Sequence, residues 1–198
     1  MPENHDKEAP DHALVAACTL WQSGQAEGSS PLRAAARVLT ETPHYFTATF
    51  IDDFEEAARR SEVLRRHAGV LLNRLSTAPS LTAAQWGELV GFPSTWAGRG
   101  TRGGPHGDQI RQSLASGRLS MPLWGVSLSP SVAASFGGQF TFEIAGPFPA
   151  IVATQHSAIK EDEMELITGG EYVVESVEDT AEAGVLARLE FIDVISPG

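Results

Sequence analysis

The chain has 198 residues, of which 42% are hydrophobic, enough for a packed core and too many for a disordered protein. Its formal net charge of −11 argues against nucleic acid as a partner, although one or two local arginines could still hold a small anion. No apolar run reaches the ~18–20 residues of a membrane span, and the N-terminus lacks the apolar core of a secretory signal peptide, so we expect a soluble protein.

The first ~90 residues have the patterns of helices. Residues 1–10 are polar, and we expect them to form a disordered tail. The expected helices are 11–22, capped by Asp11; one that opens at Ser30 and Pro31 and ends before Pro43; a long one over 52–75; and 82–90, capped by Ser80. We therefore predict one domain over 11–198, with a helical subregion over 11–92 and a β-rich catalytic core over 93–198.

The second half alternates short apolar runs with Gly, Pro and Ser breaks, which is typical of strands. The expected strands are 94–99, 123–127, 140–144, 150–154, 163–167, 171–174 and 185–194, interrupted by helices over 105–116 and 130–136. Helices followed by a mostly antiparallel β region predict an α+β fold. A parallel doubly wound sheet would need a helix between successive strands throughout.

One arginine in this half has surroundings suited to an anion. Arg99 ends a predicted strand within a glycine-rich stretch, 98–104, where the backbone would let an anion approach. A guanidinium pairs with a diphosphate in a bidentate way, so this stretch is a candidate phosphate site. Read alone, it fits equally a flexible surface loop with solvated arginines.

Two serines, Ser127 and Ser129, follow the next strand on the same side of an extended backbone. Because Ser129 precedes Pro130, it also fits the N-cap of the following helix. Ser127 could instead hydrogen-bond and aim a neighbouring side chain.

A third stretch gathers acidic side chains. Glu161 and Glu163, and by the same spacing Glu165, would project from one face of a strand. Clustered carboxylates repel one another, which a fold tolerates mainly where it is useful. The alternative is an exposed acidic edge that discourages strand-to-strand aggregation.

The order of the three stretches resembles the arginine–serine–glutamate class of mono-ADP-ribosyltransferases, which includes binary-toxin and exoenzyme-like members. The resemblance covers residues 94–194. Arg99 followed by Gly100 looks like the family's strand arginine, and Ser127-Leu128-Ser129 looks like its Ser-Thr-Ser motif. The remaining matches are Ala134 and Phe136 in the next helix, residues 154–160 as the loop that contacts the acceptor protein, and Glu161-Asp162-Glu163 as the Glu-x-Glu motif.

The resemblance implies two small, mostly antiparallel sheets around an NAD cleft, with helices packed on the N-terminal side. It implies NAD as a substrate and no metal, with Arg99, Gly100, Ser127 and Ser129 holding the cofactor. Ser127 would aim Glu163, whose carboxylate would bind the ribose 2′-hydroxyl and stabilise an oxocarbenium-like charge. Glu161 would orient an arginine of the target protein.

Three departures from the family pattern leave alternatives open. Arg99 lacks the usual preceding aromatic residue, so Arg102 competes for its role, and Leu128 replaces threonine. Glu163-Met164-Glu165 is a second register for the Glu-x-Glu motif. We prefer Glu163 as the second glutamate because its spacing to Gly169 and Tyr172 then fits the family's glycine turn and aromatic strand.

The predicted function is transfer of ADP-ribose from NAD to an arginine of a protein target, by a toxin, effector or phage-type modifier. Such a protein would work in the cytoplasm or be delivered into a host cell. The close alternative is an NAD glycohydrolase, with water as acceptor. The alternative from another class is a non-catalytic acidic interaction module, which NAD should not stabilise thermally.

Overall fold

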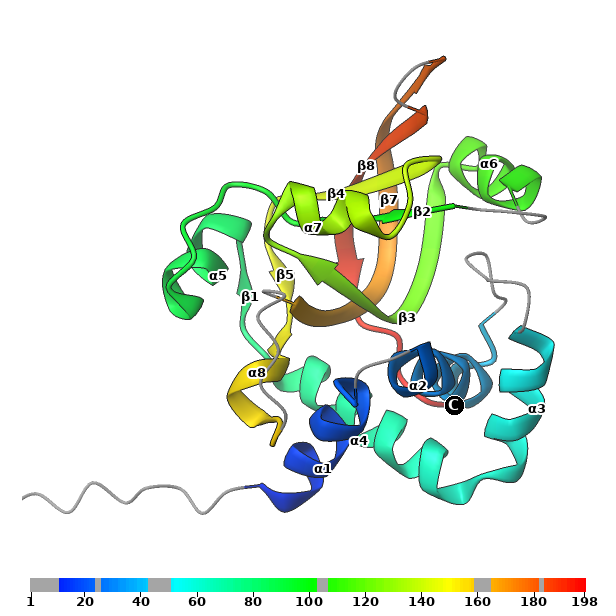
Figure 1. The fold of residues 1–198 in the computed structure, drawn as a ribbon. Helices are drawn as coiled ribbons and strands as arrows, with labels where there is room; N and C mark the ends of the chain where they lie inside the picture. Colours follow the sequence, from blue (N-terminus) through cyan, green and yellow to red (C-terminus); the bar gives the residue numbers. More distant parts are fainter. Residues whose placement is uncertain (1–10, 24–25, 43–50, 103–106, 159–164, 182–183) are drawn as a thin grey trace, which may run out of the picture.

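The computed structural model describes residues 11–23, 26–42, 51–102, 107–158, 165–181 and 184–198. Within these ranges a layer of helices lies against one side of a strongly curved sheet (Figure 1). The predicted α+β fold is confirmed. The expected tail, 1–10, lies outside the described residues.

The helical layer comes from the first part of the chain. Its elements are α1 (His12–Trp21), α2 (Ala26–Thr40), α3 (Ile51–Arg60) and α4 (Glu62–Thr77). A fifth helix, α5 (Ala83–Val90), lies apart from them and packs through Trp86 into a different hydrophobic cluster (Figure 1). Asp11 caps α1 as predicted, because its carboxylate accepts the N–H groups of Ala13 and Leu14 at 3.1 Å each. None of the helices in the described ranges is long and apolar enough to cross a membrane.

The prediction of a single long helix over 52–75 is wrong, because the helix is interrupted at Ser61, between α3 and α4. The Ser61 backbone is extended, and its hydroxyl accepts the N–H of Leu64, so this residue caps α4. Arg65 then reaches back and donates to the carbonyl oxygens of Ala58 and Arg59, at the end of α3. The three- and four-residue spacing of apolar side chains continues across this interruption, so the sequence pattern alone does not reveal it.

The predicted start of the second helix is also wrong. α2 begins at Ala26, so Pro31 lies inside the helix and Ser30 is not its cap. Pro31 is the sixth residue of α2, so it lacks the N–H that would donate to the carbonyl oxygen four residues earlier, and α2 continues past it with that one hydrogen bond missing.

Ser80 does not cap α5, contrary to the prediction. Thr82 does so, through a capping box in which its hydroxyl accepts the N–H of Gln85 and the Gln85 side chain accepts the N–H of Thr82. Ser80 belongs instead to a short strand, β1 (Ser80–Leu81), which pairs with β5 (Phe148–Pro149).

The larger sheet has six strands in the order β3-β2-β4-β8-β7-β6, and β3 also pairs with β7, so the sheet closes on itself. Its strands are β2 (Gly98–Thr101), β3 (Arg118–Ser127), β4 (Phe140–Ala145), β6 (Ile151–Val152), β7 (Glu165–Thr180) and β8 (Gly184–Asp193). Only β4 and β8 pair in parallel among the described strands. The short helices α6 (Gly107–Ala115), α7 (Pro130–Ser135) and α8 (Ala153–His156) connect them.

Several predicted strand bounds require correction. The strand expected over 94–99 begins only at Gly98, and the one expected over 150–154 ends at Val152, where α8 follows. The strands expected over 163–167 and 171–174 are one continuous strand, β7.

Gly169 therefore makes no turn, contrary to the prediction. It lies opposite an irregularity in β3 between Met121 and Trp124, where the two strands approach closely. A Cβ on Gly169 would overlap the carbonyl oxygen of Pro122. Glycine is needed here for close approach of two backbones.

We expect Gly169→Ala to destabilise the protein by about 1–3 kcal/mol, because the methyl group would displace the β3 backbone. Thermal unfolding measures this as a lower Tm. Gly69→Ala is the matched control: it lies in α4, and its added methyl would meet only Leu39 Cδ1, at 4.0 Å. The control should be stabilising by about 0.5–1 kcal/mol. Equal Tm values for the two variants would contradict the expected backbone clash.

Two hydrophobic clusters hold these layers together. One fills the inside of the closed sheet, where Trp124 donates to the hydroxyl of the fully buried Tyr172 at 3.0 Å. The other joins α1, α2 and α4 to the outer face of the sheet, through Leu123, Ile151 and Ile167. The helical layer is thereby fixed to β3 and β7, the strands that carry the candidate site.

Candidate functional site

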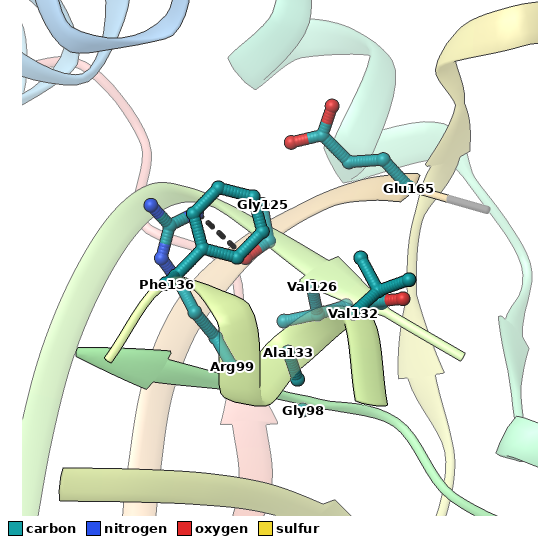
Figure 2. A pocket seen from close by; sticks show the side chains of 9 residues that line it. Gly98, Arg99, Gly125, Val126, Val132, Ala133, Phe136 and Glu165 are labelled. Atoms are coloured by element: carbon teal, nitrogen blue, oxygen red, sulfur yellow. Dashed lines mark hydrogen bonds between the residues drawn. The ribbon is translucent and has the colours of Figure 1, made fainter. Parts of the chain in front are cut away.

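A pocket with about 250 Å³ of empty volume lies where β2, β3, β7 and α7 meet (Figure 2). Its lining residues are Gly98, Arg99, Gly125, Val126, Ser127, Val132, Ala133, Phe136 and Glu165. Arg99 and Glu165 are the charged residues of this lining, and Val126, Val132, Ala133 and Phe136 are among its apolar ones.

Arg99 enters the pocket from β2. Its Nη1 donates to the carbonyl oxygen of Gly125 at 3.2 Å. The ring of Phe136, at the end of α7, lies over the guanidinium with its centroid 4.9 Å from Cζ (Figure 2). This cation–π contact and the hydrogen bond hold the guanidinium in one place, as anion recognition requires.

Ser127 and Glu165 face each other across two paired strands. Ser127 ends β3, Glu165 begins β7, and the two residues are direct antiparallel partners. Ser127 is 4% exposed, and its hydroxyl accepts the N–H of Ser129 at 3.0 Å. The predicted serine therefore lies next to a glutamate, and that glutamate is Glu165.

The other two residues predicted to hold a cofactor have structural contacts. Ser129 caps α7, because its hydroxyl accepts the N–H of Val132 at 3.4 Å. Gly100 lies so close to α7 that an added Cβ would overlap the carbonyl oxygen of Gly137. Neither residue lines the pocket, and their predicted role in binding stays a prediction.

Arg99 and Arg102, the two candidates for the strand arginine, differ in position. Arg99 lines the pocket, whereas Arg102 is exposed and packs beside Gly137. Glu161 and Glu163 lie outside the described residues, as does part of the expected acceptor loop, 154–160.

A second arginine near the pocket was not predicted from the sequence. Burial and the neighbouring guanidiniums of Arg99 and Arg37 lower the pKa of Arg33 on α2, while the Glu165 carboxylate raises it. The charge of Arg33 is therefore influenced by both charged groups of the pocket, although Arg33 is not one of the lining residues. A helical pair of arginines four residues apart, Arg33 and Arg37, was the available signal.

The two arginines of α2 have incompletely satisfied donors. Within the part of the chain that the structure describes, the buried Nε of Arg33 and the buried Nε and Nη2 of Arg37 have no hydrogen-bond partner. Arg37 is 8% exposed and is compensated by Glu55, with Nε and Oε1 3.6 Å apart. Arg33 donates through Nη2 to the Ser30 hydroxyl at 2.9 Å. A half-buried cation with a buried, unfilled donor is costly, so Arg33 would be stabilised by an anion nearby.

The site thus combines three chemical features. The guanidinium of Arg99 can hold phosphate oxygens, and Arg33 adds a second positive charge whose pKa Arg99 influences. The Glu165 carboxylate can stabilise positive charge or accept a hydrogen bond. The wall formed by Val132, Ala133 and Phe136 can hold a flat apolar ring.

Three solved structures share this arrangement of helices and strands. The C3 exoenzyme of Clostridium limosum is 12% identical, covering 92% of this chain and 86% of its own, with a TM-score of 0.55. The ADP-ribosyltransferase Vis of Vibrio splendidus, in complex with the inhibitor M6, is 14% identical over 92% and 73%, with a TM-score of 0.53. The ADP-ribosyltransferase toxin Plx2a of Paenibacillus larvae is 14% identical over 92% and 87%, with a TM-score of 0.50. No protein-family model and no curated protein matches the sequence significantly.

Proposed function

We propose that this chain, which has the fold of the ADP-ribosyltransferases, binds NAD, breaks its bond between nicotinamide and ribose, and transfers the ADP-ribose to an arginine of a protein target. The observation that carries the proposal is the convergence of Arg99, Ser127 and Glu165 on one pocket. These residues are 66 positions apart at most, and the fold brings them together. Arg99 and Arg33 would bind the diphosphate, and the apolar wall would hold nicotinamide.

The proposed chemistry follows from the charge of NAD. When the bond from ribose C1′ to the nicotinamide nitrogen breaks, nicotinamide leaves with the electron pair as a neutral molecule, so no general acid is needed. The electron-poor C1′ then resembles an oxocarbenium ion, which a nearby carboxylate stabilises. A guanidinium nitrogen of the target attacks C1′ and loses a proton. Because the guanidinium pKa exceeds ~12, this acceptor needs a carboxylate partner.

We assign the carboxylate near ribose to Glu165 and the acceptor's partner to Glu163, which is the second register left open by the sequence. The pairing of Ser127 with Glu165 supports this register, because a buried serine beside a carboxylate can fix its orientation. The register preferred from the sequence, Glu161 with Glu163, is the alternative that mutagenesis can distinguish.

We expect the purified protein to transfer label from radiolabelled NAD to agmatine, a small arginine analogue, and to be thermally stabilised by NAD. At NAD concentrations 100 times the Kd, binding should increase the free energy of unfolding by about 2.7 kcal/mol, which should raise Tm by several degrees. Release of labelled ADP-ribose without agmatine labelling would indicate a glycohydrolase instead. A protein with neither cleavage nor stabilisation would contradict the proposal and favour an interaction module.

A further inference from the structure

We propose that Gly125 is a positioning residue of this site, whose missing side chain leaves the space over β3 in which the Glu165 carboxylate lies. The inference rests on the proposed function, because it concerns how the carboxylate assigned to ribose is placed. Gly125 is neither part of the sequence motifs nor a charged residue, so neither of these signals identifies it as a residue of the site.

Strand register brings Gly125 and Glu165 together. Ser127 is paired with Glu165, and Gly125 with Ile167, so Gly125 and Glu165 are diagonal neighbours on the same face of two antiparallel strands. Side chains on a strand lean along its direction, so a long side chain can reach a diagonal position. Glu165 does so, and its carboxylate lies over the Gly125 position.

The space above Gly125 is occupied by the charged groups of the pocket. A Cβ built on Gly125 would overlap Glu165 Oε1, with Glu165 Cδ at 3.2 Å and Arg99 Nη1 at 3.3 Å. These three atoms are its nearest neighbours. The carboxylate and the guanidinium therefore approach the same point above one glycine (Figure 2).

Backbone geometry does not explain this glycine. Gly125 is not among the described glycines with positive φ, so its strand conformation suits any residue. Close backbone packing does not explain it either. An added Cβ at Gly98 would overlap the Phe142 carbonyl oxygen, whereas at Gly125 the nearest atoms all belong to the side chains of Glu165 and Arg99. The absent side chain serves the pocket.

Gly125 thereby fixes both ionic groups. Its carbonyl oxygen accepts a hydrogen bond from Arg99, and its open α-carbon receives the Glu165 carboxylate. A methyl group would leave the guanidinium nearly in place, at a tight but tolerable contact. It would displace the carboxylate, whose overlap with the methyl group is much larger.

We expect Gly125→Ala to lower kcat for NAD cleavage by about 10- to 100-fold, since a displacement of about 1 Å in a reacting group can cost that much. The Kd for NAD, measured by calorimetry, should change by less than about threefold, because the guanidiniums that hold the diphosphate stay. Gly138→Ala is the matched control, because nothing lies within 4 Å of its added Cβ. Its kcat and Kd should equal those of the wild type.

Three results would overturn the inference. The first is a wild-type kcat in Gly125→Ala. The second is a loss of NAD-binding stoichiometry equal to the loss of kcat, which would show a folding defect instead of a displaced carboxylate. In either case a wild-type protein that cleaves NAD leaves the proposed function intact. The third is a wild-type protein that neither binds nor cleaves NAD, which would end the proposed function and this inference together.

Discussion

Glu165→Gln should lower the rate of NAD cleavage by about 10³-fold, the largest effect expected from any single substitution in this protein. Glutamine has the shape of glutamate but not its negative charge, so it cannot stabilise the positive charge that develops on ribose. NAD binding should persist, because removing a carboxylate next to Arg33 also removes a competitor for the phosphates. Single-turnover cleavage of labelled NAD and calorimetry measure the two effects separately.

The same experiment distinguishes the two registers of the glutamate motif. If Glu165 acts on ribose, Glu163→Gln should abolish transfer to agmatine but retain hydrolysis of NAD, and Glu161→Gln should be close to wild type. If the register preferred from the sequence holds, Glu163→Gln abolishes cleavage, Glu161→Gln abolishes transfer, and Glu165→Gln is nearly silent. Glu178→Gln, an exposed glutamate on the same strand as Glu165, is the control for loss of charge alone.

The expected turn at Gly169, on which the preferred register of the glutamate motif was based, shows where sequence reasoning reached its limit. Motif order predicted Arg99 and Ser127 as site residues, and both line the pocket. The choice between glutamates rested on an expected turn at Gly169, but that glycine lies within a continuous strand beside Pro122. A glycine between two apolar runs reads as a turn in sequence, whereas here it allows close approach of another backbone. Only the paired strands reveal the difference.

In the helical half of the chain, sequence reasoning likewise predicted local features and missed those that depend on tertiary packing. The α+β order and the Asp11 cap followed from local patterns, because caps and apolar spacing are local features. The break at Ser61 and the role of Arg33 did not. An arginine on an alanine-rich helix looks like a solvated side chain until the packing of α2 on β3 brings it near Arg99. Charge clusters that span distant segments are properties of tertiary packing.

Arg33→Met should weaken NAD binding by about 10- to 100-fold, the loss expected when one charged hydrogen-bond donor worth about 1.5–3 kcal/mol is removed from a phosphate. Arg99→Met should have an effect of similar size, and the double variant should bind NAD too weakly to measure by calorimetry. Methionine keeps much of the apolar stem of arginine, so packing changes little. Arg60→Met is the control, because its side chain is 78% exposed and pairs only with Glu56 on the same helix among the described residues.

Stability should change in the opposite direction at Arg33. Its pKa is lowered by burial and by two neighbouring guanidiniums, so at neutral pH the folded protein holds an unfavourable charge there. The ligand-free Arg33→Met variant should therefore have a Tm at least as high as that of the wild type, while the increase of Tm on adding NAD should be much smaller. A cation that lowers the stability of the empty protein and strengthens the binding of an anion is a ligand-binding group. A large fall in ligand-free Tm with an unchanged Kd for NAD would instead assign Arg33 a structural role and leave Arg99 as the principal phosphate contact.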